Sequence, residues 1–504
     1  MSRSELTSGR LLARNTGLNF VAQGVLLLVA LIAIPLLVKG LGTERFGIFI
    51  LIWTLIGYFG LLDLGLGRAM TQAVAEILGK GNEEELPAVA WTGLLLTGLL
   101  GIVGATLLLI FVPWLVTSGI KTPPFLQEES RTAFYLLALS LPFVLSPVGL
   151  RGLLEAHQRF DLTVSISMPM AVVSFLSPLL VLPFSRSLDA VVAVLLVGRI
   201  IGWLAHLVVC LRTLPYLRGE VVWNPAVLAP LFRRGAWMTV SNVISPAMVY
   251  LDRFVIGAML SLAAVAYYVT PYEIVTKLWM VPGAVLSVMF PAFAMSFAKD
   301  QQQTAALFDR AMRTILLIVF PLALVLVVFA PEGLSLWLGQ EFSRQSTGVV
   351  RWLAVAVFVN CCAQVAFAVL QGVGRPDLTA KLHLLELVPY IVALWWLVGR
   401  FGITGAAVAW ALRVLVDTVI LFGLAKRQLP AKSVAVPKTL VVLAGALCTF
   451  GVAVLLQGLI VNATFVAFVL LNSVVLGWRQ GLTAEERRVV RSLLPGMREA
   501  SSTP

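Results

Sequence analysis

The residues of this chain that could do chemistry are charged side chains inside long apolar stretches. An ionised group in the hydrocarbon core of a membrane is costly unless it meets water or an oppositely charged partner, so such groups often mark functional positions. A buried cation can host an anionic ligand, and a buried carboxylate can exchange H⁺ or Na⁺. The set comprises Asp63, Arg68, Arg151, Glu155, Arg199, Asp252, Arg253, Glu273, Lys277, Glu386, Arg413 and Asp417.

The spacing of these charges limits which of them can meet. Asp252 and Arg253 are adjacent, and adjacent residues on a helix diverge by about 100°, so the two cannot face one partner. Glu273 and Lys277 are four residues apart and can pair directly, either as a structural ion pair or as a functional one. Arg413 and Asp417 have the same spacing, and there a structural pair is favoured.

The composition identifies the environment of these charges. The 504 residues are 59% hydrophobic and 12% charged, with a mean hydropathy of +0.95. A soluble domain carries roughly 25% charged residues. The apolar residues lie in runs of roughly 17 to 30, which is the length that crosses a bilayer. We therefore expect an all-α polytopic membrane protein.

We expect about fourteen transmembrane helices, of which the last is at the short limit. They are predicted at 15–38, 47–69, 88–116, 132–153, 162–183, 189–211, 236–259, 264–296, 312–330, 347–370, 381–399, 403–425, 438–460 and 461–477. The eighth contains Pro271, Pro282 and Pro291, which predict kinks because proline lacks a backbone N–H.

The net charge of +12 does not indicate nucleic acid, because the basic residues cluster in alternate loops, as the positive-inside rule requires. Only seven of the 37 Lys and Arg residues fall in loops on the other side: Lys39, Arg45, Lys121, Arg131, Arg186, Arg344 and Arg400. Both termini are therefore expected in the cytoplasm and the protein in the inner (plasma) membrane.

A repeated phrase indicates that the chain has two halves. Leu154–Thr163 returns as Leu370–Thr379 at a constant offset of 216 (370 − 154), with five of ten positions identical. We predict two six-helix lobes, residues 1–223 and 224–430, related by a pseudo-two-fold axis along the membrane normal. Residues 431–504 would add two helices and a cytoplasmic tail.

Several functions lack a sequence basis. The chain contains no Walker loop, so ATP is not the expected energy source. His157, His206 and His383 have no metal-ligand spacing and are interpreted as structural. No loop is long enough to hold a soluble catalytic domain, so we expect no catalytic residues, metal or cofactor.

The motifs together resemble bacterial polysaccharide (O-antigen type) flippases of the multidrug/oligosaccharidyl-lipid/polysaccharide exporter superfamily. The resemblance covers most of residues 10–425 and rests on Asn15-Thr16, Leu41–Gly47, Leu62–Gly67, Leu154–Asp161 and Leu251–Gly257. It implies two lobes around a cavity that opens alternately inward and outward. The implied cargo is an undecaprenyl-pyrophosphate-linked oligosaccharide, with H⁺ or Na⁺, membrane lipids and polysaccharide assembly proteins as further partners.

A pyrophosphate that crosses hydrocarbon needs cationic hosts, and arginine suits it through its bidentate fork. The candidate hosts, in order, are Arg253, Lys277, Arg68, Arg151 and Arg14. If a cation gradient drives turnover, the candidate coupling carboxylates are Glu273, Asp252 and Asp63.

Three alternatives remain. A cation-coupled multidrug exporter would need an acidic cavity, whereas basic groups here equal or outnumber acidic ones within the spans. A peptidoglycan-precursor (lipid II) flippase is favoured by the fourteen-span count. A membrane polysaccharide ligase or polymerase would need catalytic groups on a sizeable outer loop, and the outer loops are short.

Overall fold

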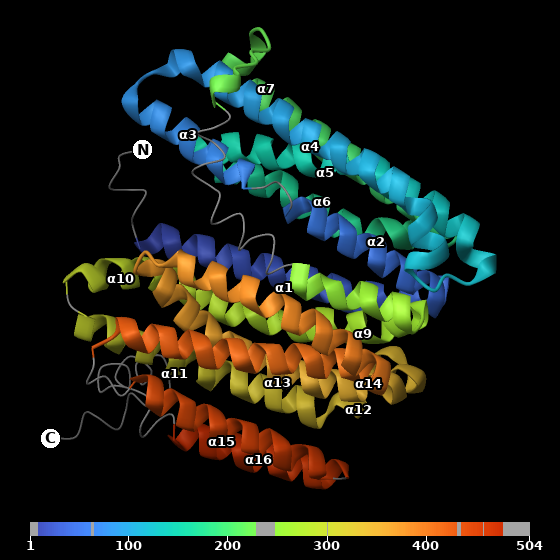
Figure 1. Cartoon of the computed structure of the whole chain (residues 1–504), viewed down its shortest axis with the longest axis vertical. Helices are drawn as coiled ribbons and strands as arrows, with labels where there is room; N and C mark the ends of the chain where they lie inside the picture. The colour runs from blue at the N-terminus through green and yellow to red at the C-terminus, as the bar shows by residue number, and fades with distance from the viewer. Residues whose placement is uncertain are drawn as a thin grey trace, which may run out of the picture. The chain divides into compact units, whose positions relative to one another are not determined.

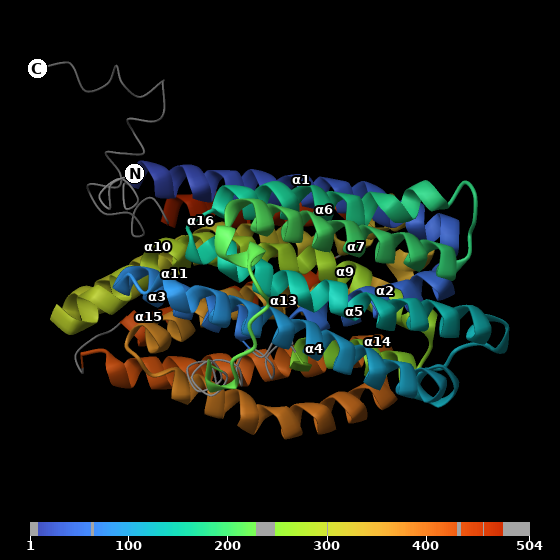
Figure 2. The same cartoon turned by 90° about the horizontal axis from the view of Figure 1, so that it is seen from above.

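All regular elements in the described part of the chain are helical. The computed structural model describes residues 9–61, 65–227, 247–299, 301–430, 435–456 and 458–476, and contains no strand within these ranges (Figures 1 and 2). Eight of the described helices are long and apolar enough to cross a membrane. The prediction of an all-helical polytopic membrane protein is confirmed.

The chain divides into two compact units. The first comprises residues 1–274 and 376–409, and the second 275–375 and 410–504. The first contains α1 (Gly9–Leu41), α2 (Thr43–Leu61), α3 (Leu66–Lys80), α4 (Leu86–Trp114), α5 (Gln127–Ala156), α6 (Phe160–Val181), α7 (Leu188–Thr213), a helical segment at 247–259 and nearly all of α9 (Leu262–Val275). The second contains α10 (Met280–Lys299), α11 (Gln301–Val328), α12 (Ala330–Leu338), α13 (Gln340–Gly372), α15 (Ala435–Leu455) and α16 (Leu459–Leu476). The long helix α14 (Pro376–Gln428) contributes to both.

Two of the predicted spans are interrupted: 47–69, which was predicted as one continuous helix, and 264–296, for which the prolines predicted kinks. The span at 47–69 is divided between α2 and α3, and Gly65 has a φ of 74°, a left-handed conformation that glycine adopts without strain. The span at 264–296 is divided by a 3₁₀ turn, Thr276–Trp279. Because Pro282 lacks an N–H, the carbonyl of Leu278 loses its α-helical donor, and it accepts a hydrogen bond from the Cys361 thiol at 3.9 Å instead.

The repeated phrase forms the same turn twice. α5 ends at Ala156 and α6 begins at Phe160, while α13 ends at Gly372 and α14 begins at Pro376, again 216 residues apart. Gln158 and Gly374 occupy equivalent positions, with φ of 58° and 79°. The amides of Arg159 and Arg375 both donate to the leucine carbonyl five residues earlier, at 2.9 Å. The repeat is confirmed at the level of local structure.

The predicted spans 381–399 and 403–425 are the two arms of α14. Gly402 between them has φ 59° and ψ −141°, which is non-helical and reverses the chain. A Cβ on Gly405 would lie 2.0 Å from the Leu397 carbonyl oxygen, so the arms meet too closely for any larger residue. The end of α13 leads into this hairpin through the second copy of the repeated turn.

Glu129 joins the beginnings of three helices of the first unit. Its carboxylate accepts a hydrogen bond from the Leu188 amide at the start of α7 and forms an ion pair with Arg45 of α2 at 2.9 Å. Since Glu129 lies in the first turn of α5, the contact fixes α2, α5 and α7 at one end. Figure 1 shows α4, α5 and α7 running alongside one another.

The contact between α2 and α9 depends on Gly47. A Cβ there would lie 2.0 Å from the Leu262 carbonyl oxygen, which belongs to the backbone and cannot rotate away. We predict that Gly47→Ala destabilises the protein by about 1–3 kcal/mol, the usual cost of overpacking, and lowers the melting temperature in detergent. Gly79→Ala is the matched control, because a Cβ at Gly79 meets nothing within 4 Å. Equal melting temperatures for the two variants would contradict this packing.

Candidate functional site

Arg253 lies at the centre of a buried polar cluster in the first unit. It comes from the helical segment 247–259, and its side chain is 2% exposed. Nη1 donates a hydrogen bond to Thr54 Oγ1 of α2 at 2.6 Å, and Nη2 donates to Glu273 Oε1 of α9 at 3.1 Å. The guanidinium therefore connects three helices inside the unit. Its Nε is buried and has no hydrogen-bond partner among the described residues.

Two tyrosine rings cover the guanidinium. The Arg253 Cζ lies 5.0 Å from the ring centroids of both Tyr250 and Tyr272, within the range of cation–π attraction. The ring of Tyr250 also meets Tyr58 of α2 edge to face, with centroids 6.1 Å apart. These rings place the permanently charged guanidinium of Arg253 in a low-dielectric site and fix the orientation of its plane.

Asp252 faces away from this partner set, as its position one residue earlier on the helix predicted. Its side chain is fully buried and accepts hydrogen bonds from the Tyr268 hydroxyl and from the backbone amide of Arg253 at 2.7 Å. Tyr268 also stacks on Tyr272, with ring centroids 6.3 Å apart. The carboxylate thus orients the aromatic ring next to the arginine.

Glu273 is the accessible member of the cluster. Its side chain is 41% exposed, although it forms an ion pair at 3.1 Å with an arginine that is almost completely buried. Its observed partner is therefore Arg253, twenty residues earlier (273 − 253), in addition to any contact with Lys277. Lys277 is half-buried in the 3₁₀ turn and belongs to the second unit. The structure thus brings together Arg253, Asp252 and Glu273 from the predicted set.

Of the remaining predicted residues, only Arg151 has a described side chain in this unit. Arg14 lies in α1 and Arg68 in α3, but their side chains fall outside the described part of the structure, and Asp63 lies outside it altogether. Arg151 is separate from the Arg253 cluster in its contacts. It forms an ion pair with Glu155 at 3.7 Å, and its side chain is 48% exposed.

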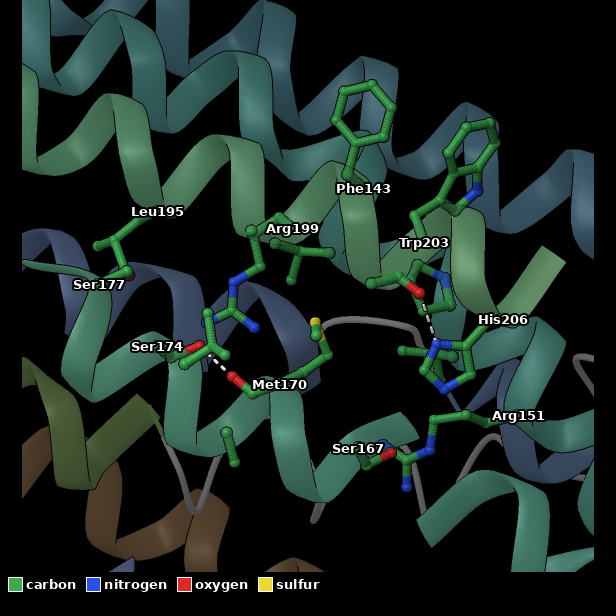
Figure 3. Close-up of a pocket in the computed structure, with 17 residues that line it drawn as sticks. Phe143, Arg151, Ser167, Met170, Ser174, Ser177, Leu195, Arg199, Trp203 and His206 are labelled. Atoms are coloured by element: carbon green, nitrogen blue, oxygen red, sulfur yellow. Dashed lines mark hydrogen bonds between the residues drawn. The ribbon is translucent and has the colours of Figure 1, made fainter. Parts of the chain in front are cut away.

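Arg151 lines a cavity of about 240 Å³ between α5, α6 and α7 (Figure 3). Arg199 and His206 of α7 also line it, together with three serines of α6 and the rings of Phe143 and Trp203. Figure 3 shows the guanidinium of Arg199 projecting into the cavity toward Ser174 and Met170. The sequence marked Arg199 as an intramembrane charge but did not rank it, since nothing in a single sequence shows which residues of three helices surround one cavity.

The described residues contain no group of three or more His, Cys, Asp or Glu side chains that could hold a metal ion. What the first unit offers instead is fixed positive charge within membrane helices, next to hydroxyl groups and aromatic faces. Such an arrangement binds anions, and arginine binds phosphate groups by parallel hydrogen bonds.

Comparison with known proteins agrees with the fold and with a role in transport. The model of the polysaccharide biosynthesis protein family matches residues 12–297. A Shigella flexneri protein named provisionally as an O-antigen transporter is 30% identical over 426 residues, which cover 82% of this chain and 98% of the relative.

Two solved structures share the fold. The lipid II flippase MurJ in an inward closed conformation has a TM-score of 0.73 at 12% identity, covering 92% of this chain and 100% of that one. An inward-facing multidrug resistance MATE family transporter has a TM-score of 0.66 at 17% identity, covering 82% and 96%.

The different exposure of the two cluster carboxylates can be measured. We predict that a cysteine at Glu273 reacts with a water-soluble thiol reagent, whereas a cysteine at Asp252 reacts only after denaturation, because the Asp252 side chain is 0% exposed. Both variants are made with Cys448→Ser, since Cys448 is the exposed cysteine among the four. The measurement is the labelled fraction of protein that elutes as a single species in detergent. Labelling of both positions at one rate would contradict the geometry of the cluster.

Proposed function

Because the chain belongs to the polysaccharide biosynthesis protein family, we propose that it is a flippase for lipid-linked oligosaccharide. The proposed cargo is an undecaprenyl-pyrophosphate-linked glycan, turned from the cytoplasmic to the periplasmic leaflet of the inner membrane by alternating access. Both termini would lie in the cytoplasm. The protein would act as a transporter and catalyse no covalent chemistry.

The observation that carries this proposal is the Arg253 cluster. A pyrophosphate cannot enter hydrocarbon without cationic partners, and Arg253 is a buried, preorganised cation at a position that the sequence predicts to lie within a membrane span, 236–259. Its guanidinium is fixed by Thr54 and by two aromatic faces, so little side-chain entropy would be lost on binding. The long prenyl chain needs no polar partner and would remain in the lipid.

Glu273 could give up its place as the partner of Arg253 to the cargo. It neutralises Arg253 in the absence of cargo, yet 41% of its side chain is exposed. A pyrophosphate that approaches Arg253 would compete with this carboxylate. If Glu273 takes up H⁺ or Na⁺ at that step, the guanidinium becomes available to the cargo, and the cation gradient is coupled to transport. Asp252 is enclosed and would hold Tyr268 in place, while Asp63 remains a second coupling candidate.

The other predicted cations would act at further steps. Lys277, next to the cluster in sequence, is proposed to receive the pyrophosphate together with Arg253. Arg151, Arg68 and Arg14 are proposed to attract the anionic headgroup from the cytoplasmic side. Arg151 lies near the C-terminal end of α5, and Arg68 and Arg14 lie near the N-terminal ends of α3 and α1. Polysaccharide assembly proteins are the expected partners for the delivered glycan.

The comparisons favour glycan over the alternative cargoes. The relative that shares 30% identity is named for O-antigen transport, and the family for polysaccharide biosynthesis. The likeness to MurJ and to a multidrug exporter concerns the fold, at 12% and 17% identity, and does not choose between lipid II, drugs and glycan lipids. The cavity, which Arg199 and Arg151 line without an acidic residue, suits an anionic cargo.

We predict that the double variant Arg253→Gln, Lys277→Gln abolishes glycan export and leaves membrane insertion intact. Each charge-assisted hydrogen bond to phosphate is worth about 1.5–3 kcal/mol, so roughly 10- to 100-fold is lost for each bond removed. The measurement is surface polysaccharide in a deletion strain that expresses the variant. The control, Arg344→Gln with Arg400→Gln, removes the same charge from two exposed positions. Full export by the first variant would eliminate both residues from the mechanism.

A second prediction concerns Glu273→Gln. The neutral amide competes less well for Arg253, so the affinity for a polyprenyl pyrophosphate should rise about fivefold while export falls, because the counter-ion no longer returns to release the cargo. Affinity is measured by native mass spectrometry of the purified protein, and export as above. The exposed Glu332 provides a matched control, Glu332→Gln. Unchanged affinity together with unchanged export would show that Glu273 takes no part in the cycle.

A further inference from the structure

The cavity between α5, α6 and α7 contains a cation that none of the described residues neutralises. Arg199 forms no hydrogen bond or ion pair with any residue that the structure describes, and its Nε is buried without a partner. It lies 11 residues beyond Leu188 at the start of α7 (199 − 188), about 16 Å along the helix axis. A guanidinium at such depth in a membrane helix requires an anion or water.

Nothing in the cavity wall supplies that anion. None of its 17 lining residues is acidic, and the lining includes both Arg199 and Arg151. Glu155 compensates Arg151 at 3.7 Å, but it does not line the cavity. Arg253, which is almost completely buried in the same unit, has a carboxylate, a hydroxyl and two rings around it. The contrast indicates that the partner of Arg199 comes from outside the described chain.

The remaining polar groups of the cavity suit a phosphate. Ser167, Ser174 and Ser177 lie along one side of α6, and the Ser177 hydroxyl is buried without a partner. His206 offers no donor in its neutral form, because Nδ1 carries the hydrogen and donates to the Gly202 carbonyl oxygen at 2.8 Å, which leaves Nε2 as an acceptor. Hydroxyl donors around a guanidinium are the groups that hold phosphate oxygens.

The size and surroundings of the cavity point to a lipid headgroup. A volume of about 240 Å³ corresponds to roughly eight water molecules in the liquid, and lies below the usual range for pockets that enclose whole organic ligands. An oligosaccharide does not fit. α6 and α7 are the least buried of the candidate spans, at 11% and 22%, and apolar side chains such as Val173 and Ile201 are exposed beside the cavity. Hydrocarbon chains would have apolar surface to lie on.

We propose that this cavity is a second anion site, separate from the Arg253 cluster, which binds the phosphate headgroup of a lipid. Arg199 supplies the charge at mid-depth, and Ser167 and Ser177 of α6 supply hydroxyl donors, whereas the Ser174 hydroxyl already donates to the Met170 carbonyl oxygen at 2.8 Å. The headgroup is either the pyrophosphate of a prenyl lipid or the phosphodiester of an anionic phospholipid. The site stands on its own contacts and does not require that Arg253 bind cargo.

The test is protection of a cysteine inside the cavity. Ser174→Cys is introduced into the full-length Cys448→Ser protein in detergent, and its rate of maleimide labelling is measured. The probes are farnesyl pyrophosphate, dioleoylphosphatidylglycerol and inorganic pyrophosphate. At saturation, one or both lipids should slow labelling at least about fivefold, and which one protects identifies the source of the phosphate. Ser167→Cys repeats the measurement at a second lining position, should the first variant fold poorly.

Arg199→Gln should raise the lipid concentration needed for protection about tenfold, and Arg199→Lys should restore part of the loss, because the charge is kept. Arg344→Gln in α13 should leave protection unchanged, because Arg344 is exposed and does not line the cavity. Labelling that neither lipid slows, or that is slowed equally in Arg199→Gln, would overturn the proposal. Equal protection by inorganic pyrophosphate would overturn the assignment to a lipid.

Discussion

The structure depends on one constraint, which is that a charge inside a bilayer must be neutralised or hydrogen-bonded by its neighbours. Arg253 meets this requirement with a threonine from α2, a glutamate from α9 and two tyrosine rings. The three helices that supply these groups are then held in one arrangement by a single side chain. The close contact at Gly47 joins α2 and α9, the two helices that carry Thr54 and Glu273, which both accept hydrogen bonds from Arg253.

The same constraint distinguishes two kinds of cation in the first unit. Arg253 is enclosed and paired, so it contributes to the unit's own structure, and in the proposed cycle it would become available to a ligand only after Glu273 leaves. Arg199 has no partner among the described residues, so its charge acts on whatever enters the cavity. Arg199 is also less buried than Arg253, which is 2% exposed. In these proposals, the presence of a partner inside the protein distinguishes Arg253, which is already neutralised, from Arg199, which is available to an anionic ligand.

The sequence was sufficient to predict the features of the fold that depend on the local pattern of residues. Apolar runs predicted the helices, the repeat at 154 and 370 predicted two equivalent turns, and a break near residue 400 predicted the reversal at Gly402. It failed at 47–69, where Gly65 in a left-handed conformation precedes α3 in a span that hydropathy alone extends. In 264–296 the prolines did predict an interruption. The partner of Glu273 was also missed. Arg253 is twenty residues away and meets Glu273 only because the chain folds back before α9.

The position of Glu273 in the chain adds a mechanical argument to the electrostatic one. Two residues later, at Val275, α9 ends and the chain passes from the first unit to the second. The 3₁₀ turn Thr276–Trp279 follows at once, and Pro282 prevents it from closing as an α-helix. Such turns have weaker hydrogen bonds than the helices around them and often mark hinges. In the proposed cycle, a change of partner at Glu273 would therefore act directly beside this turn, whereas Asp252 is enclosed and hydrogen-bonded by Tyr268.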